Sequence, residues 1–244
     1  MLAALHRHLL PPPLPRTSAA SGSAPSIGAA ELDCGNIEVI DASDPTHIRL
    51  AIRPDVPCAR EEGKEHFHWF FFAARGLRGP CVLSIENAGE ASYAWKGWPS
   101  LLPGDPGFRA RVSHDRRRWR ALQSTSYDEG SGVLRIEHDA ATAAHGAVYI
   151  AAFEPYDAAD HAAFLSHITT PTPTLPHPLR HTVLGRSLDG AAIDLLSLEG
   201  GPLVVWVLGR QHPGESMGSF FIEGLVSKTF EALSCRKFVN LHEG

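Results

Sequence analysis

Residues 203–216 read Leu203-Val204-Val205-Trp206-Val207-Leu208-Gly209-Arg210-Gln211-His212-Pro213-Gly214-Glu215-Ser216. The unbroken apolar run at 203–208 is typical of a buried strand, and the polar residues after it predict a loop. Beyond the loop, apolar residues recur every three or four positions and predict an amphipathic helix: Met217, Phe220, Phe221, Leu225, Val226, Phe230 and Leu233. Because ligands of α/β sheets bind at loops beyond strand ends, we expect chemistry at residues 209–216.

His212 and Glu215 are the loop side chains that suit a metal ion. An imidazole nitrogen and a carboxylate oxygen in one short turn can occupy two corners of a tetrahedral zinc site, and a third protein ligand leaves the last corner for a reactive water. The H-x-x-E spacing arises about once by chance in a chain of this composition. The place of the motif, between a predicted strand and a predicted helix, is therefore better evidence for a metal site than the spacing itself. Pro213 biases His212 toward extended backbone and Gly214 permits a tight turn, which favours presentation at a strand end.

Two other interpretations of this loop stay open. Residues 214–218 also fit the G-x-S-x-G pattern of serine hydrolases, with Ser216 as the nucleophile. Such an elbow directly follows its strand, whereas several loop residues intervene here. Alternatively, Ser216 or Glu215 only caps the helix, and His212 is a surface residue.

Residues 36–153 contain short apolar-alternating runs separated by Gly, Pro and Asp. Such runs, with no helical pattern among them, predict an antiparallel sandwich or barrel. His66 and His68 alternate along one run, where a solvated sheet face is favoured over a metal site. The basic run 115–120 is interpreted as a hairpin edge, with recognition of an acidic partner as the alternative. The predicted strands are 37–41, 48–52, 66–74, 81–86, 133–137 and 147–153.

Changes in amino-acid composition and hydrophobic pattern divide the chain into four segments. Residues 1–30 lack acidic residues and contain a proline run, which predicts a disordered leader or a transit peptide. Residues 31–155 form the predicted β domain. Residues 156–180 hold a predicted helix at 157–168 and a stiff Pro-rich linker. Residues 181–244 begin a second domain, with strands predicted around 182–184 and 193–196.

The composition excludes several classes of function. With 244 residues, of which 43% are hydrophobic and 20% charged, the chain can bury a core. Its formal net charge of −5 argues against a nucleic-acid binder. No apolar run approaches the roughly 18–20 residues of a membrane span. Four cysteines without a C-x-x-C pair predict free thiols in a reducing compartment.

Several separate segments resemble the zinc carboxypeptidase family, in the cytosolic carboxypeptidase branch that includes protein deglutamylases. The start of that branch's catalytic domain is similar to Leu184-Gly185-Arg186-Ser187-Leu188-Asp189-Gly190, Gln211-His212-Pro213-Gly214-Glu215-Ser216 and Phe221-Ile222-Glu223-Gly224-Leu225. Its N-terminal β-sandwich domain is similar to His68-Trp69-Phe70-Phe71-Phe72, Ile85-Glu86-Asn87-Ala88, Ser113-His114-Asp115-Arg116 and Phe153-Glu154-Pro155-Tyr156. The likeness covers roughly residues 36–230.

This resemblance implies an α/β catalytic domain, incomplete and with a mixed sheet and helices, preceded by an all-β antiparallel sandwich domain. It implies one Zn²⁺ per active site, with His212 and Glu215 as two of its ligands, and hydrolysis of C-terminal residues from peptides or proteins. Substrates in this branch are often glutamate-rich ends such as the tails of tubulin, for which Arg210 is the candidate substrate-binding cation. A cytoplasmic location is implied, or an organelle if residues 1–30 are a transit peptide. Neither a nucleic acid nor a membrane is expected as a partner.

A second hypothesis makes the chain a non-catalytic module that binds acidic tails through residues 116–120 of the β domain. The third is the serine hydrolase that uses Ser216.

The family's third zinc-binding histidine, its substrate-gripping asparagine–arginine pair and its glutamate general base all lie farther beyond H-x-x-E than this chain extends. The chain therefore resembles a family member truncated within the catalytic domain, with its general base expected beyond Gly244. His242 lies 27 residues after Glu215, too near for the family's third histidine. We expect little or no activity, and low solubility from an exposed apolar sheet edge around residues 204–207.

Overall fold

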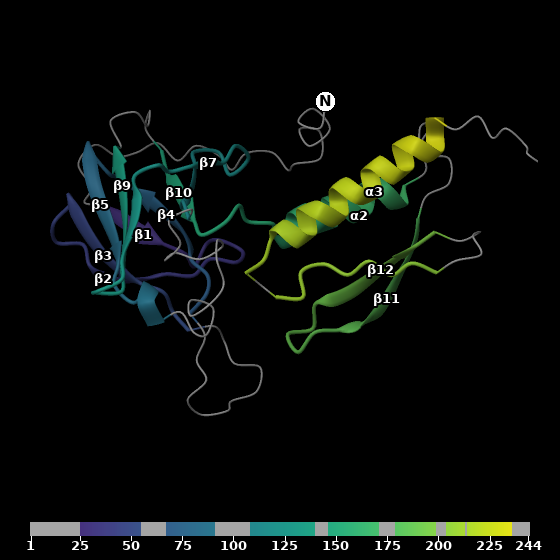
Figure 1. The fold of residues 1–244 in the computed structure, drawn as a ribbon, viewed down its shortest axis with the longest axis horizontal. Helices are drawn as coiled ribbons and strands as arrows, with labels where there is room; N and C mark the ends of the chain where they lie inside the picture. Colours follow the sequence, from purple (N-terminus) through teal and green to yellow (C-terminus); the bar gives the residue numbers. More distant parts are fainter. Residues whose placement is uncertain are drawn as a thin grey trace, which may run out of the picture. The chain divides into compact units, whose positions relative to one another are not determined.

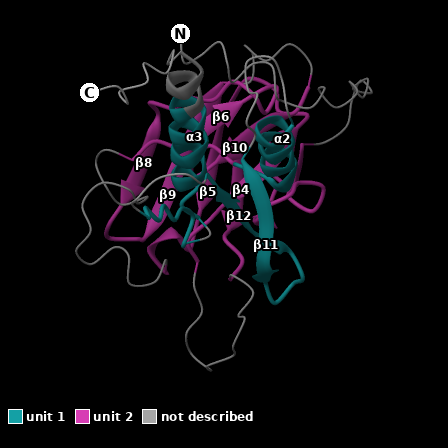
Figure 2. Cartoon of the chain, turned by 90° about the vertical axis from the view of Figure 1, so that its right-hand side faces the viewer, with its two compact units in different colours: residues 1–11, 156–244 teal, residues 12–155 magenta. Residues whose placement is uncertain are grey.

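The computed structural model describes residues 25–54, 67–90, 108–139, 146–170, 179–198, 204–212 and 214–235, without the side chains of 230–235. The chain forms two compact units, which meet in the sequence between Pro155 and Tyr156 (Figure 2). The first unit along the described chain ends at Pro155 and is magenta in Figure 2, and the second begins at Tyr156 and is teal.

The first unit is built from two five-stranded sheets (Figure 1). One has the strand order β1-β4-β10-β6-β7 and the other β2-β3-β5-β9-β8. Strands of the first sheet are β1 (Ser26–Gly28), β4 (Phe71–Arg75), β10 (Val148–Ala151), β6 (Arg111–Ser113) and β7 (Arg120–Ala121). Strands of the second are β2 (Glu38–Asp41), β3 (His47–Ala51), β5 (Pro80–Ile85), β9 (Val133–Asp139) and β8 (Thr125–Asp128), and a 3₁₀ turn spans Ala88–Glu90.

Alternating side chains give these sheets their buried faces. Along β9, Leu134 and Ile136 are fully buried, whereas Arg135 and Glu137 between them are exposed, as expected from the two-residue period of a strand. In the other sheet, Phe71 and Phe72 of β4 are also fully buried. Residues of both sheets belong to one hydrophobic cluster, so the two sheets share a core. Each of the six predicted strands is present, with shifted ends.

The prediction of a purely antiparallel domain is wrong for one pair of strands. β3 and β5 run parallel, with His47 opposite Val82 and Leu50 opposite Ile85. A parallel pair needs a long crossover connection. Here the chain leaves β3, forms β4 in the other sheet and then returns to β5, which lets β5 follow the direction of β3.

The predicted leader at residues 1–30 is wrong at its C-terminal end. Ser26–Gly28 form strand β1, which pairs with β4, and Ala29 is buried. Residues 1–24 lie outside the described residues. The pairing of Ile27 with Ala74 shows that the packed structure starts before the segment where sequence alternation becomes visible.

Two helices and a hairpin make up the described part of the second unit. Helix α2 (Ala158–Thr169) confirms the predicted helix, and Asp157 caps it by accepting from the backbone N–H of Ala159 and Asp160. β11 (Arg180–Arg186) and β12 (Ala192–Ser197) pair as an antiparallel hairpin, and α3 (Met217–Cys235) confirms the predicted amphipathic helix. A small cluster of Phe164, Ile168 and Leu179 forms the buried core of this unit, with Leu196, Ile222 and Val226 packed against it.

Asp194 of β12 joins the hairpin to α2. Its two carboxylate oxygens lie 2.8 Å from Nε2 of His161 and 2.6 Å from Nε2 of His181. Burial raises the pKa of Asp194, but the hydrogen bonds from the two histidines outweigh it and hold the pKa below its ordinary value. Asp194 therefore stays ionised near neutral pH.

The strand predicted at 203–208 is not observed. Residues 204–208 carry no strand pairing, and Val204 and Val205 are about 80% exposed. A buried strand needs hydrogen-bonding neighbours, yet the described strands of this unit pair only with each other. The mixed sheet expected for the catalytic domain is therefore not formed by these residues. Residues 204–207 are exposed, as expected, but they do not form the expected sheet edge.

The pH dependence of the first unit offers a test of its core. Burial, followed by the nearby charges of His114 and Arg120, lowers the pKa of His138, whose Nε2 has no hydrogen-bond partner among the described residues. The ring thus stays neutral in the folded chain and binds a proton on unfolding as the pH falls through about 6.5. Acid should lower the free energy of unfolding, and His138→Leu should reduce this loss.

Urea unfolding at about pH 5 and about pH 7.5, followed by tryptophan fluorescence, measures the difference. The control is His47→Gln, an exposed histidine of the same unit, which should keep the wild-type pH dependence. Equal pH dependence in His138→Leu and the wild type would contradict this explanation.

Candidate functional site

The structure brings His212 and Glu215 together in the loop that precedes α3. Nδ1 of His212 lies 2.9 Å from Oε1 of Glu215. The backbone N–H of Glu215 donates to the carbonyl of His212 at 3.1 Å, so a single turn presents both side chains. Their side chains are 69% and 48% exposed, which leaves both groups accessible to a ligand from solvent.

This donor pair fits zinc. Zinc prefers imidazole nitrogen and carboxylate oxygen among its ligands, and bonds at a tetrahedral angle hold two such atoms about 3.4 Å apart. The observed separation of 2.9 Å needs only a small opening to reach that value.

A third ligand does not join the pair within the described part of the chain, where no three His, Cys, Asp or Glu side chains converge as a metal site. His242, the alternative third ligand, lies outside the described residues.

Arg210, the candidate substrate-binding cation, turns toward the protein. Its guanidinium NH1 donates to the backbone carbonyl of Tyr156, and its backbone is left-handed with φ 53°. This contact is not visible in the sequence, because 54 positions separate the two residues. The carbonyl of Tyr156 has no side-chain signature that could have revealed it.

Two glycines let the loop approach the start of α3. A Cβ on Gly209 would lie 2.6 Å from Cδ1 of Ile222 and 3.0 Å from the carbonyl oxygen of Gly218. A Cβ on Gly218 would lie 2.8 Å from the backbone nitrogen of Arg210. At Gly218 the obstacle is backbone, so the close approach requires glycine there. At Gly209 the nearest atom is the flexible end of Ile222, which can move aside, and the carbonyl oxygen of Gly218 leaves only a tight fit for a Cβ.

The burial of Ser216 disfavours the serine-hydrolase interpretation. The residue is 1% exposed and immediately precedes α3, at the N-cap position. A nucleophile elbow instead exposes its hydroxyl.

The basic run lies in the turn between β6 and β7, in agreement with the hairpin interpretation. The guanidinium of Arg116 lies 6.0 Å from the ring centres of Phe71 and Tyr149, so this cation is directed onto aromatic rings of the sheet. Asp115 Oδ1 accepts from the backbone N–H of Arg117 and Arg118 and fixes the turn. His66 falls outside the described residues, and His68 is half-buried.

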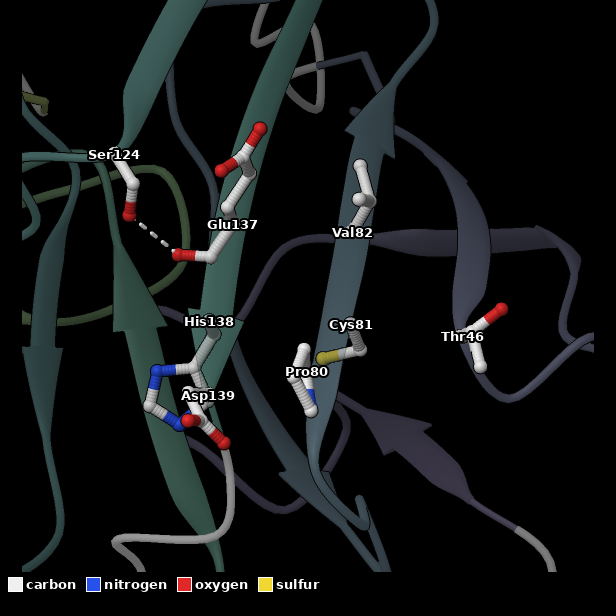
Figure 3. A pocket seen from close by; sticks show the side chains of 8 residues that line it. All are labelled: Thr46, Pro80, Cys81, Val82, Ser124, Glu137, His138 and Asp139. Atoms are coloured by element: carbon white, nitrogen blue, oxygen red, sulfur yellow. Dashed lines mark hydrogen bonds between the residues drawn. The ribbon is translucent and has the colours of Figure 1, made fainter.

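A shallow pocket occurs at one end of the second sheet (Figure 3). Cys81 and His138 lie directly opposite each other on β5 and β9 and belong to its lining. Burial raises the pKa of the Cys81 thiol, so the sulfur stays protonated and is a poor nucleophile. Neither Cys81 nor Cys34 forms a disulfide with a described residue.

Comparisons with known proteins identify the family of this chain's relatives. The cytosolic carboxypeptidase N-terminal domain matches residues 29–153. An uncharacterised protein of Zymomonas mobilis is 30% identical over 200 residues, which cover 82% of this chain and 46% of that protein. A metallo-carboxypeptidase from Burkholderia cenocepacia is 32% identical, with a TM-score of 0.67 over 84% of this chain and 49% of that one.

A metallo-carboxypeptidase from Pseudomonas aeruginosa, solved in complex with (2-guanidinoethylmercapto)succinic acid, is 33% identical. Its TM-score is 0.65 over 83% of this chain and 48% of that one. This chain thus spans about half the length of the relatives that it matches. Among the described helices, none has the length and apolar character needed to cross a bilayer.

The space around two glycines of α3 predicts opposite changes in the free energy of unfolding when each is replaced by alanine. Gly218→Ala should lower the free energy of unfolding by about 1–3 kcal/mol, because the new methyl group meets the backbone of Arg210. Gly224→Ala is the matched control, since its Cβ would meet no described atom within 4 Å outside its own helix. Alanine should stabilise that helix position by about 0.5–1 kcal/mol. Thermal unfolding followed by circular dichroism at 222 nm measures both, and a neutral Gly218→Ala would show that the loop does not need this approach.

Proposed function

The chain belongs to the zinc carboxypeptidase family, with the N-terminal domain of the cytosolic carboxypeptidases, and from this membership we propose that it carries the β domain and the first two zinc ligands of a metallocarboxypeptidase. The β domain proposed for residues 31–155 is extended at its start by strand β1 (Ser26–Gly28), and the start of the catalytic domain is proposed for residues 181–244. The facing donor atoms of His212 and Glu215, 2.9 Å apart in one turn, carry the proposal.

The reaction is hydrolysis of the C-terminal residue of a peptide or protein. When bound, zinc supplies a Lewis acid that polarises a carbonyl oxygen and lowers the pKa of a bound water. The role of the chain's own residues is to hold the ion. His212 contributes a neutral nitrogen donor and Glu215 a negative oxygen donor, and their exposure leaves room for a substrate end to approach.

Acidic chain ends, such as glutamate tails, are the proposed substrate class. This class rests on the resemblance to the cytosolic carboxypeptidase branch, whose substrates are often glutamate-rich ends. The Pseudomonas relative was solved with a ligand that carries two carboxyl groups and a guanidino group, so that ligand does not distinguish acidic from basic substrate side chains.

Zinc binding by the purified chain tests this assignment directly. Competition with a chromophoric chelator should detect one zinc ion per chain. His212→Ala and Glu215→Ala should each weaken the affinity of the chain for zinc at least about tenfold, because each substitution removes one of only two protein ligands. His167→Ala, which removes an exposed histidine of α2, should retain the wild-type affinity.

Binding of a Glu-tailed peptide to the zinc-loaded chain, compared with a peptide of equal length that ends in a neutral residue, then tests the substrate class without requiring turnover. Zinc binding that survives in both His212→Ala and Glu215→Ala would remove these residues from the metal site. Equal affinity for the two peptides would remove the acidic specificity while leaving the metal site intact.

A further inference from the structure

Arg210 occupies an unusual backbone position two residues before His212. Its φ of 53° lies in the left-handed region, which costs free energy for a residue with a side chain. A non-glycine residue held there needs compensation from its surroundings. The hydrogen bond from its guanidinium to the carbonyl of Tyr156 provides such a contact. Hydrogen bonds from charged donors are stronger than those between neutral groups.

Tyr156 is in turn fixed by α3. Its side chain is 4% exposed, and its ring packs edge-on against Phe220, with 5.1 Å between ring centres. Its phenol shares a hydrogen bond with the side chain of Glu223. Burial, followed by the charge of Glu223, raises the pKa of Tyr156, so the phenol keeps the proton that it donates. Helix α3 therefore anchors the tyrosine whose carbonyl receives Arg210.

These contacts close a circuit around the loop. From Arg210 the chain runs through His212 and Glu215 into α3. Phe220 and Glu223 of α3 contact the side chain of Tyr156, and the backbone carbonyl of Tyr156 accepts a hydrogen bond from Arg210. The side chains of His212 and Glu215 are too exposed for packing to orient them. Apart from the 2.9 Å contact between the two side chains, their placement depends on the backbone of the loop, whose two ends are Arg210 and the first turn of α3.

We propose that Arg210 is a positioning residue, which holds the His212–Glu215 turn in its metal-binding form through the carbonyl of Tyr156. The proposal rests on the proposed function and extends it, because it replaces direct substrate binding with a structural role for this cation. It also gives a role to Tyr156 of the Phe153–Tyr156 segment, which the sequence singles out without an assigned purpose.

The test compares Arg210→Asn with Arg210→Lys in the full chain. Asparagine tolerates left-handed backbone but is too short to reach Tyr156, whereas lysine keeps a long cationic donor. Zinc affinity should fall about tenfold in Arg210→Asn and recover most of this loss in Arg210→Lys. The midpoint of thermal unfolding should change little in either variant.

A second readout needs no zinc. Hydrogen exchange of the Glu215 and Gly218 amides, which donate to the carbonyls of His212 and Glu215, should become about tenfold faster in Arg210→Asn in the metal-free chain. Tyr156→Phe is the control that removes the phenol hydrogen bond but keeps the receiving carbonyl. It should retain more protection of these amides than Arg210→Asn.

The two readouts separate the possible failures. If the wild-type chain binds no zinc through His212, the proposed function fails, and faster exchange in Arg210→Asn would still support the positioning role. Unchanged exchange in Arg210→Asn would overturn the positioning role, even in a chain that binds zinc. A zinc affinity lost equally in Arg210→Asn and Arg210→Lys, without faster exchange, would point instead to direct contact with the site.

Discussion

The close approach of Gly209 to Gly218 is the constraint on which the loop that carries His212 and Glu215 depends. It brings the chain before the loop against the first turn of α3, with so little space that a Cβ on Gly218 would collide with the backbone of Arg210. Because the ends of the loop are fixed in this way, the few residues between them must turn sharply. The imidazole of His212 and the carboxylate of Glu215 then emerge on one side of the turn. Their pairing therefore combines the turn that backbone packing imposes with the direct 2.9 Å contact between the two side chains.

Local sequence patterns predicted the elements that depend on local physics. The helix at 158–169 has its own capping box at Asp157, and the hairpin of β11 and β12 turns at Gly190, whose φ of 84° suits glycine. The strand expected at 203–208 depends instead on neighbours that a sequence pattern cannot supply. The side chains of this apolar run would be buried if a strand paired with it on each side. Here the run pairs with no described strand, and its side chains are exposed. The parallel pairing of β3 with β5 was missed for a related reason, because alternation reveals a strand and not the direction of its neighbour.

The candidate site likewise combines features that follow from local sequence with features that depend on tertiary contacts. His212 and Glu215 could be predicted because both lie in one short loop and their side-chain chemistry is specific. Arg210 was expected to bind substrate, since its charge is the only property visible in the sequence. Its contact with a distant backbone carbonyl, and the edge-on packing of Tyr156 against Phe220, arise from tertiary structure. The function of this cation thus follows from where its neighbours place it.

The exposed run at 204–208 has a consequence for the fate of the chain in a cell. Its five apolar residues are accessible, and few apolar side chains are buried among the described residues of its unit. Short extended apolar segments are what holdase chaperones bind and what proteases and aggregates capture first. The concentration of this chain would then be governed by the capacity of protein quality control, and its abundance would fall when that capacity is occupied by other clients.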